Sequence, residues 1–350
     1  MRAQCGDMDD HDLSPPPRDA ATAPYARLTP ECVLDALDSV LLPDGRRTDG
    51  RLLALNSYEN RVYQVGVEDG PPLVAKFYRP GRWSDEAILE EHAFVAELVE
   101  REIPVVPALT YDGRTLHEFE GFRFALFERR GGRAPELDRS DTLEWLGRFI
   151  GRIHAVGASQ SYRARPALDL RTFGFEPRDW LLEHDFIPAD VRAAWQAAVA
   201  FALEGVEAAF ERAGDVRALR LHGDCHPGNV LWTDAGPHFV DFDDSRMGPA
   251  VQDLWLLLPG DGRPAATRAL TDLLAGYEDF CEFEPRELHL VEALRTLRLV
   301  HYSAWLAQRW DDPAFPAAFP WFNTQRYWED RILELREQIG AMQDGPLWPV

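Results

Sequence analysis

Residues 222–244, which read HGDCHPGNVLWTDAGPHFVDFDD, constrain the fold more than any other part of the chain. Asp224 is followed by Asn229, and Asp241 comes at the end of an apolar run. Phosphoryl transfer with Mg²⁺ needs such groups in this order. One carboxylate takes the proton of the attacking hydroxyl, and an amide oxygen and a second carboxylate hold the metal on the nucleotide phosphates. We therefore expect Asp224 and Asp241 to be catalytic, and Asn229 and Asp241 to bind the metal.

The local pattern suits this chemistry. Residues 230–232 and 238–240 are typical of two short strands, and residues 233–236 of the hairpin turn between them. Pro227-Gly228 predicts a further turn that aims Asn229 inward. An isolated Asp and Asn at this spacing is more often an ordinary turn, but the HGD before it and the DFD after it favour a functional loop.

The N-terminal half predicts a strand, loop, strand, turn, strand meander over residues 50–79. Lys76 lies within the apolar strand VAKFY, where a buried ammonium needs an anionic partner. ATP phosphates and a glutamate from the following helix, residues 84–101, would supply that partner. Glu90 and Glu91 are both candidates, because neighbouring residues of a helix point about 100° apart.

These motifs resemble those of the aminoglycoside phosphotransferase group, relatives of the protein kinases, in which H-R-D-x4-N becomes H-G-D-x4-N. Here DFD stands where protein kinases have DFG. Longer segments resemble a bacterial branch of this superfamily, the stress-response Ser/Thr protein kinases. These segments are LNSYENRVYQV, VAKFYRPGRWS, ILEEHAF, GPAVQDLWLLL and RWDDPAFPAAFPWF. The resemblance extends over residues 30–335.

The resemblance implies an α+β, bilobal, protein-kinase-like fold. We expect a disordered tail over residues 1–28, an N-lobe with a small antiparallel sheet over 29–130, and a mostly helical C-lobe over 131–345. The residue patterns predict helices near residues 29–40, 84–101, 140–154, 188–213, 264–280, 285–310 and 324–342, and a further apolar helix that opens at residues 252–255. The aromatic, proline-rich segment 311–322 is read as a packed tail, with an exposed docking patch as the alternative.

The resemblance also implies the cofactors and the remaining site residues. ATP and Mg²⁺ are expected, with Lys76 on the α- and β-phosphates and Glu91, or Glu90, holding Lys76. The loop after the first strand has no glycine, so Ser57 and the neighbouring backbone N–H groups would cradle the phosphates. Phe127 and Arg129 are the expected backbone contacts to the nucleotide base. Two further residues would order the catalytic loop by hydrogen bonds: His222 and Asp253. His154 is read as a core residue.

The expected substrate is a Ser or Thr hydroxyl on a protein. A small hydroxylated molecule such as an aminoglycoside, choline or homoserine is the alternative. A catalytically dead nucleotide-binding module is a third reading, and the intact set of Lys76, Asp224, Asn229 and Asp241 argues against it. The short link after Asp241 makes regulation by a phosphorylated activation loop improbable.

The formal charge of -22, from 59 acidic and 37 basic residues, argues against binding to nucleic acid or to an anionic membrane. No apolar run approaches the roughly 20 residues that a membrane-spanning helix needs, and no secretory signal is visible. The four cysteines are far apart and favour a reducing cytoplasm. Cys225 is read as a small loop residue, with a redox role as the alternative. We expect a cytoplasmic monomer.

Overall fold

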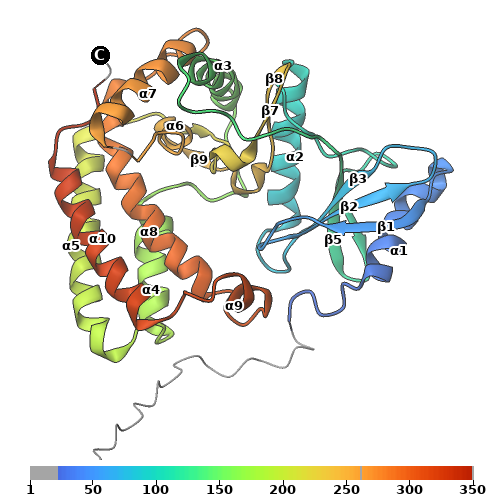
Figure 1. Cartoon of the computed structure of the whole chain (residues 1–350), viewed down its shortest axis with the longest axis horizontal. Helices are drawn as coiled ribbons and strands as arrows, with labels where there is room; N and C mark the ends of the chain where they lie inside the picture. The colour runs from blue at the N-terminus through green and yellow to red at the C-terminus, as the bar shows by residue number, and fades with distance from the viewer. Residues whose placement is uncertain (1–22, 261, 349–350) are drawn as a thin grey trace, which may run out of the picture.

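A computed structural model describes residues 23–260 and 262–348 of the chain. A small antiparallel sheet with two helices lies on one side of the molecule, and a larger, mostly helical part lies on the other (Figure 1). The expected α+β architecture with two lobes is therefore confirmed. The lobe boundary at residues 130 and 131 stays a prediction.

The sheet has five strands in the order β1-β2-β3-β5-β4, and all neighbours are antiparallel. Its strands are β1 (Thr48–Ala54), β2 (Arg61–Val67), β3 (Leu73–Phe77), β4 (His117–Phe119) and β5 (Phe122–Glu128). Helix α1 (Pro30–Leu41) covers one face and shares a buried core with the sheet. Thr29 caps α1 by accepting the Cys32 N–H at 3.2 Å, as its sequence predicts.

Helix α2 (Asp85–Glu100) lies between the sheet and the helical part (Figure 1). Ser84 caps it by accepting the Ala87 N–H at 3.2 Å. Ile88 packs with the sheet, whereas Phe94 and Leu98 belong to the core of the helical part. Because α2 is buried on both sides, it fixes the sheet relative to the catalytic segments.

The helical part includes the hairpin expected after Asn229, which contacts α3 (Ser140–Gly157) through its second strand. Its helices are α3 (Ser140–Gly157), α4 (Glu176–Glu183), α5 (Ala189–Ala213), α6 (Val251–Trp255), α7 (Arg263–Tyr277), α8 (Val291–Ala307), α9 (Ala314–Ala318) and α10 (Gln325–Gln343). Strands β7 (Val230–Thr233) and β8 (Gly236–Phe239) form the expected hairpin, and β6 (Leu219–Arg220) pairs with β9 (Met247–Gly248). Within the described ranges, no helix is both long enough and apolar enough to cross a bilayer.

Two segments differ from the sequence-based expectation, and a third agrees with it. The helix expected over 285–310 is split into a 3-10 segment, Pro285–Leu290, and α8, and buried Glu287 in the first piece accepts the Val251 N–H at 2.8 Å. Of the disordered tail expected over residues 1–28, residues 1–22 lie outside the described part of the chain. From residue 23 it packs on the sheet, where the Tyr25 hydroxyl donates to the carbonyls of Glu59 and Phe77. Segment 311–322 contains the short helix α9 and buries two of its rings, Phe315 and Phe322, as a packed tail would.

Candidate active site

The loop before Asp224 depends on a glycine. Gly223 has φ +89°, and a Cβ there would lie 2.1 Å from the backbone oxygen of Asp244, so only glycine fits. The backbone N–H groups of His222 and Gly223 donate to the two carboxylate oxygens of Asp253, at 2.7 and 2.9 Å. These bonds tie the loop of Asp224 to α6, as the resemblance implies.

Asp253 has a second role in the same cluster. His154, completely buried, contacts the Asp253 carboxylate at 3.0 Å and the Tyr277 hydroxyl at 3.0 Å. Burial by itself would raise the pKa of Asp253, but the hydrogen bonds from His154 and Gly223 outweigh burial and lower it. The carboxylate therefore stays ionised and keeps accepting from the loop. His222 orders the other side, since its Nε2 lies 2.9 Å from the Val240 carbonyl oxygen.

Asp224 and Asn229 are brought together within this loop. The Asn229 side-chain Nδ2 donates to the Asp224 backbone oxygen at 2.9 Å. This bond fixes the amide so that its oxygen is the atom left for a metal. The Asp224 carboxylate is 21% exposed, and its Oδ1 accepts from Arg298 Nη1 of α8 at 2.7 Å. Its Oδ2 lies 3.5 Å from His226 Nε2.

Asp241 follows the hairpin, as expected, but its backbone is not extended. It has φ 61° and ψ 64°, a left-handed conformation that is uncommon for residues other than glycine. Residues in such conformations are often found at functional sites. The side chain is 54% exposed and accepts from Lys76 Nζ at 2.9 Å. The DFD segment thus leaves the hairpin and meets the strand that carries Lys76.

Lys76 has a second carboxylate partner, Asp243, whose Oδ1 lies 3.2 Å from Nζ. Burial by itself would lower the pKa of Lys76, but the charges of Asp241 and Asp243 outweigh burial and hold that pKa well above its ordinary value. The ammonium therefore stays charged inside the structure. Asp243 occupies the position at which DFG has glycine, and its carboxylate is a neighbour of Lys76 that the motif alone does not reveal.

The expected ion pair between Lys76 and Glu91 is wrong as a direct contact. Buried Glu91 lies 3.0 Å from Arg165 Nη2 and influences Lys76 only through its field. Arg165 is the partner of Glu91. Its planar guanidinium also donates to the carbonyls of Ala87, Asp243 and Ser245, so the hydrogen-bonding groups of the buried arginine are satisfied from several directions.

The alternative partner, Glu90, points elsewhere. Its carboxylate accepts the backbone N–H groups of residues 163, 164 and 165 at 2.8, 3.0 and 3.2 Å. Glu90 therefore holds the loop that delivers Arg165, while Glu91 receives the Arg165 side chain. Two neighbouring glutamates of α2 therefore bind the backbone and the side chain of the Arg165 segment.

Three further expected site residues are placed around the sheet. The Ser57 hydroxyl donates to the Asn60 backbone oxygen at 3.1 Å, within the loop between β1 and β2. Phe127 pairs with Val74 across β5 and β3, so it lies two residues from Lys76 in the register of the sheet. Arg129 Nε donates to Gln64 Oε1 at 2.8 Å. Their roles toward a nucleotide stay predictions.

The same β1–β2 loop, residues 56–60, is held by the C-terminal part of the chain. Glu59 accepts from Trp305 Nε1 at 2.6 Å and also pairs with Arg309. The Tyr58 ring meets the Phe319 ring edge-on, with centroids 4.8 Å apart. The C-terminal segment therefore packs on the loop that is expected to cover the phosphates.

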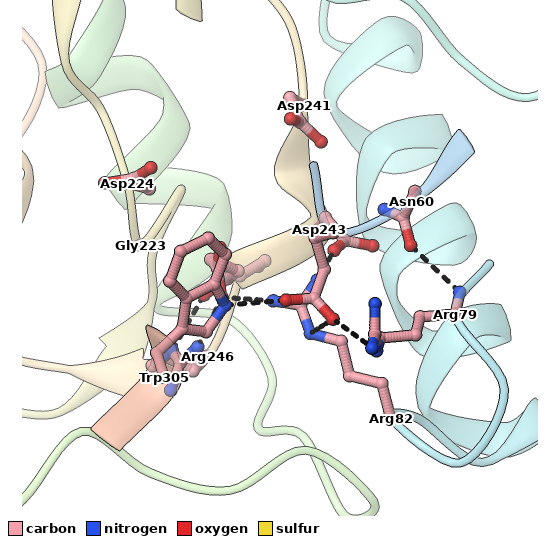
Figure 2. A network of polar contacts seen from close by, with 12 residues as sticks. Asn60, Arg79, Arg82, Gly223, Asp224, Asp241, Asp243, Arg246 and Trp305 are labelled. Atoms are coloured by element: carbon pink, nitrogen blue, oxygen red, sulfur yellow. Dashed lines mark hydrogen bonds and ion pairs between the residues drawn. The ribbon is translucent and has the colours of Figure 1, made fainter. Parts of the chain in front are cut away.

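Ionic contacts between the two lobes continue from this loop. Asp312 is buried and lies 2.9 Å from Arg79 Nη1 and 3.2 Å from Arg61 Nη2. Arg82, from the segment after β3, pairs with both Asp243 and Asp244. Figure 2 shows Arg79 and Arg82 approaching from the sheet side, with Asp243 next to Arg82 and Asp224 on the opposite side. These arginines were not singled out in the sequence, because no local pattern shows which carboxylates meet them.

Cys225, directly after Asp224, is completely buried. Burial raises the pKa of its thiol well above the ordinary value, mainly by disfavouring the thiolate. A thiol in this state is a poor nucleophile, which supports its reading as a packed loop residue.

Comparison with known proteins identifies the family. The model of the phosphotransferase enzyme family matches residues 51–291. Stress response kinase A of Escherichia coli (strain K12) is 45% identical over 323 residues, which cover 92% of this chain and 96% of that protein. The chain belongs to the phosphotransferase enzyme family. A protein described as serine/threonine protein kinase RdoA, from Salmonella typhimurium, is 44% identical over the same shares of the two chains. The resemblance to stress response kinases is thus confirmed.

Solved structures show that the fold is that of this phosphotransferase family. Amicoumacin kinase hAmiN in complex with AMP-PNP and Ca²⁺ has a TM-score of 0.66 at 19% identity, covering 86% of this chain and 90% of that one. A microcompartment-associated aminopropanol kinase has a TM-score of 0.63 at 19% identity, covering 84% and 91%. At this identity the likeness establishes the fold, and the two sets of side chains are compared no further.

Proposed function

We propose that this phosphotransferase is a Ser/Thr protein kinase of the bacterial stress response that transfers the γ-phosphate of ATP with Mg²⁺. The observation that carries the reaction is that Asp224 and Asn229 are hydrogen-bonded within one loop, while Asp241 after the hairpin binds Lys76 of β3. The protein acceptor is supported by the 45% identity to stress response kinase A over nearly the whole chain.

The residues present fit a Mg²⁺–nucleotide complex. Asn229 is anchored through its amide nitrogen, which leaves the oxygen for the metal, and Asp241 is half-exposed beside Lys76. Among the described residues, no three His, Cys, Asp or Glu side chains are grouped as a self-sufficient metal site. That composition suits Mg²⁺, which is usually held by one or two carboxylates together with substrate phosphates. Bound there, the metal would neutralise charge on the phosphates.

The proposed step is an in-line transfer between oxygens. The acceptor hydroxyl oxygen forms the new bond to the γ-phosphorus, the bond from that phosphorus to the bridging oxygen of ADP breaks, and the hydroxyl proton goes to the Asp224 carboxylate. Lys76, kept charged by its carboxylate neighbours, binds the α- and β-phosphates. Ser57 and the neighbouring backbone N–H groups cover them. The products are ADP and a phosphoester.

The decisive variant is Asp224→Ala. We expect phosphotransfer to fall by at least about 10²-fold, because general-base catalysis contributes about 10²–10⁴-fold, while ATP still binds in calorimetry. Asp190→Asn, on the exposed side of α5, is the control and should behave as wild type. Near-normal turnover by Asp224→Ala would show that the carboxylate has another role.

A small hydroxylated acceptor is the second candidate, because both solved relatives above are described as small-molecule kinases. The purified enzyme should be offered a basic model protein, its own chain and a panel of small alcohols, with ATP and Mg²⁺. Mass spectrometry should then compare cells that carry the active enzyme with cells that carry Asp224→Ala. Proteins that are phosphorylated only in the first cells are the acceptor candidates. Transfer to a small alcohol alone would contradict the protein-kinase proposal.

A further inference from the structure

A pocket outside the proposed ATP site lies where α8 meets the start of α10. Its volume is about 350 Å³, and it is lined by three aromatic residues and four polar or charged ones: Tyr302, Trp321, Tyr327, Thr324, Arg326, Asp330 and Arg331. We call it the α8–α10 pocket. A volume of this size lies within the range of pockets that bind specific ligands, about 300–1,000 Å³. None of its residues has a part in the nucleotide chemistry described above.

The pocket lies one helical turn along α8 from Arg298, the arginine that contacts Asp224. Arg298, which holds Asp224, and Tyr302, which lines the pocket, are four residues apart on α8 and so share a face of the helix. Burial raises the pKa of Tyr302, and the charges of Arg298 and Arg331 lower it, so the phenol lies within the fields of both arginines. The same helix face continues to Trp305, whose ring stacks on Tyr302 with centroids 5.6 Å apart. Trp305 in turn binds Glu59 of the β1–β2 loop.

The pocket lining holds two arginines, Arg326 and Arg331, and one carboxylate, Asp330. The lining thus carries more cationic than anionic side chains, although the formal charge of the whole protein is -22. Arg331 is fixed by Glu334 and lies over the Tyr327 ring, at 5.2 Å from its centroid. The Arg326 side chain is 89% exposed and makes only a loose contact, 3.8 Å, with Asp330.

The aromatic walls add a second kind of recognition. Trp321 lies against Tyr327 with ring centroids 5.7 Å apart, and Tyr302 is supported by Trp305. Rigid aromatic rings together with arginine are the residues that most often dominate binding energy at protein interfaces. A ligand that suits these walls carries an apolar side chain next to carboxylates.

We propose that the α8–α10 pocket is the acceptor subsite of the enzyme, and that it binds an acidic segment of the protein substrate. This inference rests on the proposed protein-kinase function. The Ser or Thr hydroxyl lies at Asp224, an apolar side chain of the substrate occupies the aromatic walls, and its carboxylates meet Arg326 and Arg331. The subsite selects acidic acceptors, although the acidity of the chain as a whole would favour basic ones.

The test uses two synthetic peptides that differ only in charge. Each has one Ser and one Phe, flanked by Asp and Glu in the first peptide and by Lys in the second. We expect the wild-type enzyme to favour the acidic peptide by about tenfold or more in kcat/KM, a difference of about 1.4 kcal/mol. Equal rates for the two peptides, or a preference for the basic one, would overturn the subsite.

Charge-reversed variants on α10 localise the effect. Arg326→Glu should raise KM for the acidic peptide about tenfold and bring the peptide preference to unity or invert it, with KM changed far more than kcat. Arg336→Glu makes the same charge change at an exposed position of α10 outside the pocket, and it should keep the wild-type preference. Equal behaviour of the two variants would show that Arg326 does not read the substrate.

The apolar wall is tested separately with Tyr302→Ala and Tyr302→Phe. We expect Tyr302→Ala to lose the advantage of the Phe-containing peptide over an Ala-containing one, and Tyr302→Phe to restore it. If peptides are phosphorylated with the same kcat/KM whatever their charge and whether or not they contain Phe, the subsite is overturned but the protein-kinase function stands. If no peptide or protein is phosphorylated while a small carboxylate-bearing alcohol is, the protein-kinase function fails and the acidic-segment proposal fails with it.

Discussion

Arg298 Nη1 lies 2.7 Å from Asp224 Oδ1, so a helix near the C-terminus holds the proposed catalytic base. The two residues are 74 positions apart in the chain. An arginine that fixes one oxygen of the carboxylate leaves the other, Oδ2, for the acceptor hydroxyl. The geometry of the base therefore depends on how α8 packs, and not only on the catalytic loop.

Replacing Arg298 should impair turnover without impairing nucleotide binding. We expect Arg298→Ala to lower kcat by about 10²-fold, the scale of loss that a misplacement of about 1 Å produces. KM for ATP should stay unchanged. Arg298→Lys should recover part of kcat, because a lysine keeps the charge but loses the planar fork. Arg295→Ala, one turn earlier on α8, is the control, and an equal loss in that variant would point to general damage to the helix.

Asp243 should make the free energy of unfolding depend on pH in the acidic range. Burial alone would raise the pKa of Asp243, but Arg82 and Lys76 outweigh it and lower the pKa from 3.8 to about 2. The unfolded chain therefore takes up this proton first as the pH falls. The stabilisation, about 2 kcal/mol, is present above about pH 4 and is lost as the pH falls through 2. Urea unfolding between pH 5 and 2 should show a shallower loss for Asp243→Asn than for wild type, whereas parallel curves would contradict the assignment.

The partner of Glu91 can be measured with double-mutant cycles. We expect the Glu91→Gln and Arg165→Gln changes to be coupled by about 1–3 kcal/mol in the free energy of unfolding, because the two groups are in direct contact. The cycle of Glu91→Gln with Lys76→Met should give a smaller coupling, since Lys76 binds Asp241 and Asp243 instead. If the coupling of Glu91 with Lys76 is larger than that with Arg165, Glu91 pairs with Lys76 in solution, as the resemblance implies.

Asp312 should control how firmly the β1–β2 loop is held. Asp312→Asn removes the buried charge that Arg79 and Arg61 share, and breaking such a pair costs about 3–5 kcal/mol. We expect faster amide hydrogen exchange over residues 56–61 and a higher KM for ATP. Asp190→Asn on α5 provides the exposed control. Unchanged exchange in this loop would mean that the aromatic contact between Tyr58 and Phe319 holds it without the ions.

Many elements could be predicted from the sequence because their signals are local. Thr29 and Ser84 start α1 and α2 as caps, and the hairpin of β7 and β8 follows from its alternation and turn residues. The order of Asp224, Asn229 and Asp241 along one short segment likewise predicted the reaction. For the two caps and the hairpin, the deciding contact lies within a few residues of the chain.

The partners of buried charges were decided only by tertiary structure. Arg165, not Lys76, meets Glu91, because the loop after α3 reaches α2 only in the folded molecule. Arg298 and Arg309 come to the site from α8 and the segment after it, and no spacing in the sequence points to Asp224 or Glu59. The sequence by itself therefore determined the elements and the chemistry of the loop. Packing of distant helices chose which arginine satisfies each buried carboxylate, because an unpaired buried charge is too costly to leave and several cations were available.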